Sequence, residues 1–206
     1  MGQCASRQGC ISNSLDEGET DMREYRRHYG IGILSALVMC LMLSVVPVQA
    51  KSALGTRTAK VVSQKTAKSD TKKTKLKKLF RYVETMNYQR KVGFRADKGW
   101  EKTYALEMLK KKRGSCYHYA AAYAFLAKKA TGYPVRVCLG KTCGFNKSVW
   151  QPHAWCEVKI GGKWYICDAN LDKFAADSSG KYYLKRSTSK AMKKVYRRES
   201  SVTVKF

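Results

Sequence analysis

The sequence predicts an α+β fold in which helices come first and pack on an antiparallel sheet that follows. Two observations carry this prediction. Apolar residues recur at three- and four-residue steps over residues 76–86, which is typical of one face of a helix. Later in the chain, two apolar runs at residues 154–160 and 163–167 flank a Gly-Gly pair, which favours a hairpin with a two-residue turn.

The helical half continues with two further segments. After the helix at residues 76–86, a second helix is expected over residues 100–112, because its Lys- and Arg-rich last turn suits the negative end of the helix dipole. Gly114 interrupts the helical pattern between this helix and the next. The third helix is expected over residues 115–130, where Thr-Gly follows it, and its many alanines allow it to lie close to a sheet.

The sheet half begins with an expected strand at residues 135–139 and a loop over residues 140–152. The hairpin follows, and weaker strand patterns occur at residues 182–184 and 202–206. These helices and strands make up one folded domain, which we expect over residues 76–206.

Residues 1–50 have the pattern of an N-terminal leader. Residues 30–50 are apolar over about the length of a bilayer span, follow three arginines and end in Val-Gln-Ala, which is typical of a secretory signal peptide. An uncleaved membrane anchor is the alternative. Both interpretations place the rest of the chain outside the membrane, secreted or on its extracellular face. Met1-Gly2 begins a myristoylation-like pattern, whereas Met22 begins a more ordinary signal peptide.

Residues 51–75 are expected to form a flexible basic linker. Residues 51–78 hold ten basic residues, one acidic residue and no aromatic residue, too little apolar surface to fold alone. The net charge of +26 for the whole chain points to anionic partners. An anionic cell-envelope polymer bound through the linker suits an exported chain, and a solubilising spacer is the alternative. Nucleic acid is disfavoured because no nucleic-acid-binding motif is visible.

Three side chains suit nucleophilic catalysis: Cys116, His153 and Asp168. A thiol nucleophile needs a base to take its proton and a third group to hold that base. Cys116 stands at an expected helix N-terminus, where the dipole stabilises a thiolate and the backbone N–H can bind an oxyanion. In the hairpin register set by a two-residue turn, His153 and Asp168 are diagonal neighbours on one face, about 7–8 Å apart at the backbone. Trp155 shares this face and is expected to line the site and bind substrate.

The motifs G-S-C-Y-H-Y-A-A, P-H-A-W-C-E-V and G-K-W-Y-I-C-D resemble, in order and spacing, the core of the transglutaminase-like superfamily. The resemblance covers residues 100–171. It implies a papain-like fold and a Cys–His–Asp site that performs acyl transfer on a protein or peptide, by hydrolysis or by transfer to an amine. A peptidase or peptidoglycan amidase also fits, and a catalytically inactive cell-surface binding module is the alternative from another class. Animal members depend on calcium, but no acidic cluster here indicates a calcium site, so no cofactor is expected.

The other cysteines leave disulfide bonds open. Cys138 with Cys143, and Cys156 with Cys167, are close enough in the expected fold to pair. Two such bonds would leave Cys116 as the free thiol. Buried free thiols explain the pattern equally well.

Zinc is the other use of Cys and His that the sequence offers. It is disfavoured because His153 and Cys156 alternate along one strand and point to opposite faces, so no metal ligand is expected. His118, two residues beyond the candidate nucleophile, is expected to be a surface or packing residue.

Overall fold

The computed structural model describes residues 52–147, 149–176, 178 and 180–206. The expected leader at residues 1–50, with its signal or anchor segment, lies outside these residues. Within the described part of the chain, no helix combines the length and the apolar character that crossing a membrane requires.

Helices dominate the first half of the described chain and strands dominate the second. The main sheet has the order β6-β5-β4-β3-β7 with antiparallel neighbours throughout, and β1 and β2 form a short parallel pair. This arrangement confirms the predicted α+β class. The elements are α2 (Ala53–Lys65), α3 (Lys72–Glu84), β1 (Asn87–Tyr88), α4 (Trp100–Lys111), β2 (Arg113–Gly114), α5 (Cys116–Thr131), β3 (Val135–Thr142), β4 (Gln151–Ile160), β5 (Lys163–Cys167), α6 (Ala169–Phe174), β6 (Tyr183–Arg186), α7 (Lys190–Lys193) and β7 (Tyr196–Thr203).

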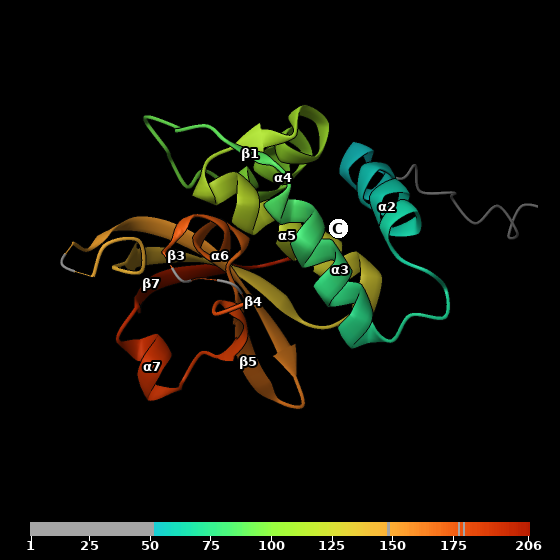
Figure 1. Ribbon diagram of the computed structural model, residues 1–206. Coiled ribbons are helices and arrows are strands. Elements are labelled where there is room, and N and C mark those ends of the chain that lie inside the picture. The colour runs from blue at the N-terminus through green and yellow to red at the C-terminus, as the bar shows by residue number, and fades with distance from the viewer. Residues whose placement is uncertain (1–51, 148, 177, 179) are drawn as a thin grey trace, which may run out of the picture. The chain divides into compact units, whose positions relative to one another are not determined.

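Helix α5 is the central helix of the domain. It contacts β3 and β4 of the sheet and also α2, α3 and α4, which gather beside it in Figure 1. Its residues from His118 to Ala127 are buried without interruption. A helix that is apolar all round is typical of such a position. The alanines in this run leave room for the close approach to the sheet that the sequence predicts.

The two faces of the sheet belong to different apolar clusters. On β4, Ala154, Cys156 and Val158 join the cluster that contains α5. Trp155 of β4 and Ile166 of β5 instead join a second cluster with residues of α6, α7 and β7. This division follows from the period of two along a strand.

The expectation of a flexible linker at residues 51–75 is wrong, and the folded domain starts with α2 rather than at residue 76. Leu54, Thr58 and Val61 recur at helical spacing and are buried, and α2 packs on α4 and α5. Composition alone misleads in this segment. A few residues on one face are enough to anchor a helix, while the basic side chains around them stay in water.

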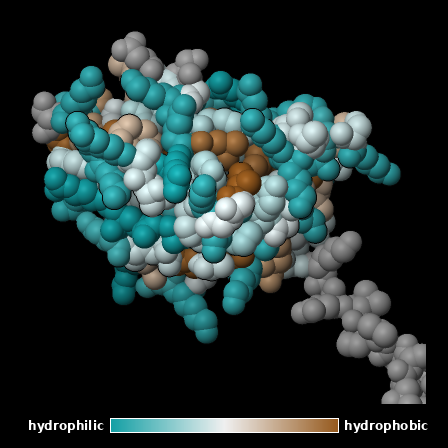
Figure 2. Space-filling view, turned by 90° about the horizontal axis from the view of Figure 1, so that it is seen from below, coloured by the Kyte–Doolittle hydropathy of each residue, from teal (hydrophilic) through white to brown (hydrophobic). Residues whose placement is uncertain are grey.

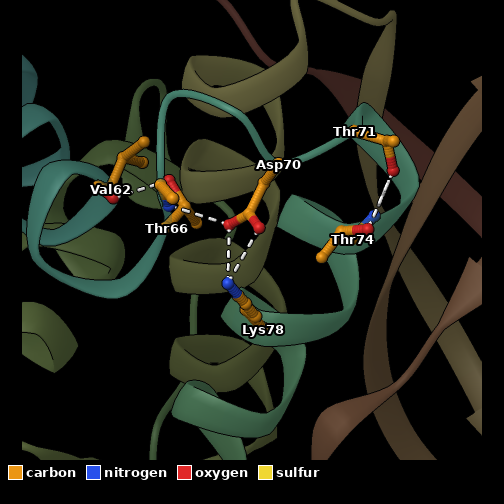
Figure 3. A network of polar contacts seen from close by, with 7 residues as sticks. Val62, Thr66, Asp70, Thr71, Thr74 and Lys78 are labelled. Carbon is orange, nitrogen blue, oxygen red and sulfur yellow. Dashed lines mark hydrogen bonds and ion pairs between the residues drawn. The ribbon is translucent and has the colours of Figure 1, made fainter.

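A polar network fixes the turn between α2 and α3 (Figure 3). The Asp70 carboxylate accepts hydrogen bonds from the Lys78 ammonium group at 2.8 and 2.9 Å, and from the backbone N–H of Ala67 at 2.8 Å. Thr71 caps α3, because its hydroxyl accepts from the backbone N–H of Thr74 at 3.1 Å. Residues that resemble linker in composition therefore supply caps and turn contacts.

The basic side chains of the described residues lie mainly on a solvated surface. Hydrophilic side chains cover most of the face shown in Figure 2, with smaller apolar patches between them. Lys65, Lys77, Lys78 and Arg81 line an open groove along α2 and α3. The segment expected to be a basic tether thus forms part of a basic groove.

Helices α3 and α6 meet through a carboxyl pair, Glu84 and Asp172. The Arg81 guanidinium lies 2.9 Å from Glu84 and 3.7 Å from Asp172. Burial, together with a hydrogen bond to Asp172, raises the pKa of Glu84 to about 7 in spite of Arg81. The charged form of Glu84 therefore opposes folding.

We expect Glu84→Gln to raise the melting temperature, relative to wild type, more at about pH 8 than at about pH 5. A carboxyl whose pKa is raised by folding contributes its full stabilisation of the folded state below about pH 4.5, its ordinary pKa. This stabilisation is lost as the pH rises through the folded-state pKa of about 7. Glutamine keeps the shape without the charge. Thermal unfolding at both pH values measures the difference, with the exposed Glu199→Gln as control. Equal differences at the two pH values would contradict this account.

Candidate active site

Cys116 is the first residue of α5, and the residues around it are packed to place it there. Ser115 is the N-cap residue, and its backbone N–H donates to Nδ1 of His118 at 3.2 Å. A Cβ at Gly114 would lie 2.5 Å from Cβ and Cγ of His118, so only glycine fits without displacing that ring. The motif G-S-C-Y-H therefore starts the helix and presents Cys116 at the end where backbone N–H groups lack helical partners.

His118 has a packing role, one of the two that the sequence predicts. Its ring stacks on Tyr104 with centroids 4.3 Å apart, and its Nε2 lies 3.3 Å from the Glu107 carboxylate. Burial lowers the pKa of His118 although Glu107 acts in the opposite direction. A neutral ring can accept from Ser115 and donate to Glu107 at once.

His153 and Asp168 meet through the hairpin. The register is the predicted one, with Cys156 opposite Cys167. His153 lies in β4 and Asp168 directly follows β5, and His153 Nε2 is 2.7 Å from Asp168 Oδ2. Both side chains are buried. A two-residue turn thus brings an imidazole to a carboxylate, as the sequence analysis expects.

Two further groups hold the Asp168 carboxylate. Its Oδ1 accepts from the backbone N–H of Leu171 at 2.9 Å and so caps α6, and its Oδ2 also accepts from the Tyr196 hydroxyl at 2.9 Å. Burial and the neighbouring carboxylate raise the pKa of Tyr196 well above its ordinary value, which keeps the hydroxyl a donor. Sequence reasoning missed Tyr196, because no local pattern relates β7 to the end of β5.

Cys116 and His153 line the same cleft, which has a volume of about 310 Å³. The Cys116 side chain raises the pKa of His153 and is 8% exposed, so it is covered but borders the cleft. The rest of the wall is mostly aromatic or amide in character and consists of Tyr88, Phe145, Gln151, Pro152, Asn170 and Phe174.

The surroundings of His153 favour its protonated form. Burial by itself lowers the pKa of His153, but the Asp168 carboxylate and hydrogen bonds to Asp168 and Cys116 outweigh burial and raise it to about 10. An imidazolium beside a thiol stabilises the thiolate. The structure therefore brings Cys116, His153 and Asp168 together in an arrangement suited to a thiolate–imidazolium pair. Their catalytic role stays a prediction.

Trp155 does not line the cleft, which corrects the expectation that it binds substrate. It shares the strand face of His153 but is 1% exposed. Its Nε1 donates to Glu157 at 3.0 Å, and its ring lies 4.9 Å from that of Tyr196. The residues of α6, α7 and β7 cover this part of the sheet, so Trp155 is a core residue beneath the site.

The residues that border the cleft beside Cys116 and His153 were missed by the sequence analysis. Tyr88 comes from the short strand β1, and Phe174 ends α6, and their rings lie 5.8 Å apart in edge contact. Asn170 had the one usable signal, its place two residues after Asp168. Nothing in the sequence indicates that β1 lies beside α6.

The cysteines of the described residues are all free thiols, so neither of the two possible disulfides is present. Among the same residues, no group of three or more His, Cys, Asp or Glu side chains could hold a metal ion. His153 instead turns its Nε2 to Asp168.

The sequence of this chain matches a known protein family. The sequence model described as the transglutaminase-like superfamily matches residues 58–169, more than half of the chain, and this range includes all three predicted catalytic residues. No curated protein matches the chain.

Several solved structures are similar to this chain, and three of them are described here. One is a protein of Cytophaga hutchinsonii described as a candidate cysteine protease, with 16% identity over 78% of this chain and 52% of that one, at a TM-score of 0.45. Another, described as a TGase, has 18% identity over 75% of this chain and 44% of that one, at 0.41. LapG of Legionella pneumophila, treated with EGTA, has 17% identity over 65% of this chain and 67% of that one, at a TM-score of 0.38. This chain spans about half the length of the first two. On its own sequence match and on the helix-and-sheet core described above, the chain belongs to the transglutaminase-like superfamily.

Proposed function

We propose that this protein is an exported cysteine enzyme that acts on amide or peptide bonds by acyl transfer through Cys116, His153 and Asp168. The observation that carries the proposal is the shared cleft of Cys116 and His153, with His153 held 2.7 Å from Asp168. A protein or peptide is the proposed substrate. Hydrolysis and transfer to an amine use the same first step.

In that step the Cys116 thiolate attacks the carbonyl carbon and forms a C–S bond. The backbone N–H of Cys116, at the start of α5, is placed to bind the oxyanion. The C–N bond then breaks, and the His153 imidazolium gives its proton to the leaving amine. A water molecule or a second amine attacks the thioester, His153 takes the proton of the attacking group, and the C–S bond breaks to restore the thiolate. Asp168 orients the ring throughout.

Export is proposed from residues 30–50, whose pattern of charge and hydropathy suits a signal peptide or an anchor. For an exported chain, the groove lined by Lys65, Lys77, Lys78 and Arg81 suits an anionic cell-envelope polymer. Binding of polyglutamate that weakens as salt is added is the corresponding measurement.

The proposal is tested by labelling the full chain with iodoacetamide at about pH 6, where ordinary thiols react slowly. We expect rapid carbamidomethylation of Cys116 alone, read by mass spectrometry of peptides. Burial raises the pKa of the Cys138, Cys156 and Cys167 thiols, so these residues should stay unlabelled. Cys116→Ser is the matched control.

Two activity assays then separate the reactions that share this thiol. Release of ammonia or peptide without added amine reports hydrolysis, and incorporation of a fluorescent primary amine into protein reports transfer. A Cys116 thiol that reacts only above about pH 8, like an ordinary cysteine, would contradict the proposal and favour a non-catalytic binding domain.

A further inference from the structure

Asn170 has a side-chain nitrogen without a hydrogen-bond partner. It lies in α6, two residues after Asp168, and is 2% exposed. Among the described residues, only Trp100 Nε1 and Asn170 Nδ2 are buried side-chain nitrogen or oxygen atoms without a partner. Buried polar groups are nearly always hydrogen-bonded, so each exception requires a physical reason.

The position of Asn170 supplies such a reason. Asn170 is part of the wall of the cleft that also contains Cys116 and His153. Trp100 does not line this cleft, and packs instead with the rings of Phe94 and Tyr104. Asn170, which carries the unpartnered donor, therefore lines the same cleft as Cys116.

The rest of the cleft wall defines what such a donor can bind. Tyr88, Phe145, Pro152 and Phe174 offer mainly apolar surface, and Gln151 offers a neutral amide. Among the residues that the structure describes, no lysine, arginine or carboxylate contributes to this wall. A neutral acceptor in apolar surroundings, such as an amide carbonyl, suits a single N–H donor.

We propose that Asn170 binds the substrate. Its side-chain amide donates an N–H to a carbonyl oxygen of the acyl group, next to the carbon that Cys116 attacks. The substrate region held in the cleft is then an uncharged amide or peptide segment. This inference rests on the proposed function, because it requires an acyl group in the Cys116 cleft. Helix α6 couples the two roles, since Asp168 caps the helix that carries Asn170.

Two alkylating reagents of similar size test the proposal on the full chain. Iodoacetamide has a carbonyl next to its reactive carbon, and allyl bromide has no oxygen acceptor. The rate of Cys116 alkylation by each reagent is divided by its rate with glutathione, and the ratio of the two normalised rates measures carbonyl recognition. We expect Asn170→Leu, which keeps the volume but removes the donor, to lower this ratio about tenfold. Asn87→Ala, at an exposed asparagine, is the control that should leave it unchanged.

The possible outcomes are distinct. A ratio that is unchanged in Asn170→Leu overturns the inference and leaves the proposed function intact. Equal slowing of both reagents, with a shifted pH profile of alkylation, means that Asn170 only supports packing, and also overturns it. Failure of wild-type Cys116 to react faster than an ordinary thiol with either reagent overturns the proposed function together with the inference.

A measurement on the wild-type chain covers the case in which Asn170→Leu does not fold. In protein labelled with ¹⁵N-asparagine, the side-chain amide signal of Asn170 should move downfield when Cys116 carries the carbamidomethyl group. It should not move in this way when Cys116 carries an allyl group. The same shift with both groups, or with neither, argues against a hydrogen bond to the carbonyl.

Discussion

An Asp168→Asn exchange is expected to lower the rate of acyl transfer about a thousandfold, because the orienting carboxylate of His153 is lost. Asparagine can still accept from the Leu171 N–H, so the cap of α6 is kept. Its side-chain NH₂ cannot accept a hydrogen bond from the His153 Nε2–H, however, so the ring loses its fixed orientation.

The pH profile gives this prediction a second readout. The Asp168 carboxylate is the main group that raises the pKa of His153 to about 10 against the effect of burial. Without the carboxylate, burial lowers the pKa of His153, so the ring loses its proton at a much lower pH than in the wild-type protein. Fast alkylation of Cys116 near pH 8 should therefore disappear in the variant. The exposed Asp97→Asn should behave like wild type, and a loss of less than tenfold in Asp168→Asn would show that His153 acts without this carboxylate.

Trp155→Ala is expected to lower the free energy of unfolding by about 3–5 kcal/mol, the usual cost of emptying a large aromatic site in a core. Trp155 is 1% exposed and packs against Tyr196, so alanine leaves a cavity. The change also removes the indole N–H from Glu157, which still accepts from Arg136. Urea unfolding measures the effect.

Trp164→Ala is the matched control for this exchange. Trp164 is half-buried on β5 and stacks with the Arg136 guanidinium, 4.0 Å from its ring centroid, so its removal should cost clearly less. The conservative Trp155→Phe should keep the alkylation rate of Cys116. A Trp155→Ala protein of normal stability with weakened substrate binding would instead restore the role that the sequence predicts for this residue.

Local patterns in the sequence predict how the three proposed catalytic residues come together. Gly114 and Ser115 mark the start of α5 and so place Cys116 at its first turn. The two-residue turn between β4 and β5 sets a register that makes His153 and Asp168 neighbours. Each of these relations spans a short stretch of chain, so the backbone geometry of a cap or of a turn is enough to decide it.

Relations between distant elements were not predictable in this way. The composition of α2 is typical of a linker because basic and other polar side chains outnumber its three buried residues, Leu54, Thr58 and Val61. These three residues are buried by α4 and α5, which follow later in the sequence. Trp155 looked like part of the cleft because the strand face was right, but the covering residues of α6, α7 and β7 lie elsewhere in the sequence.

The sequence by itself therefore determined the family, the fold class and the order of Cys116, His153 and Asp168. The tertiary structure decided what surrounds them: Tyr196 on the carboxylate, Asn170 in the cleft wall and Trp155 in the core. The physical reason is that a register depends on neighbours along the chain, whereas burial depends on which distant surfaces pack together.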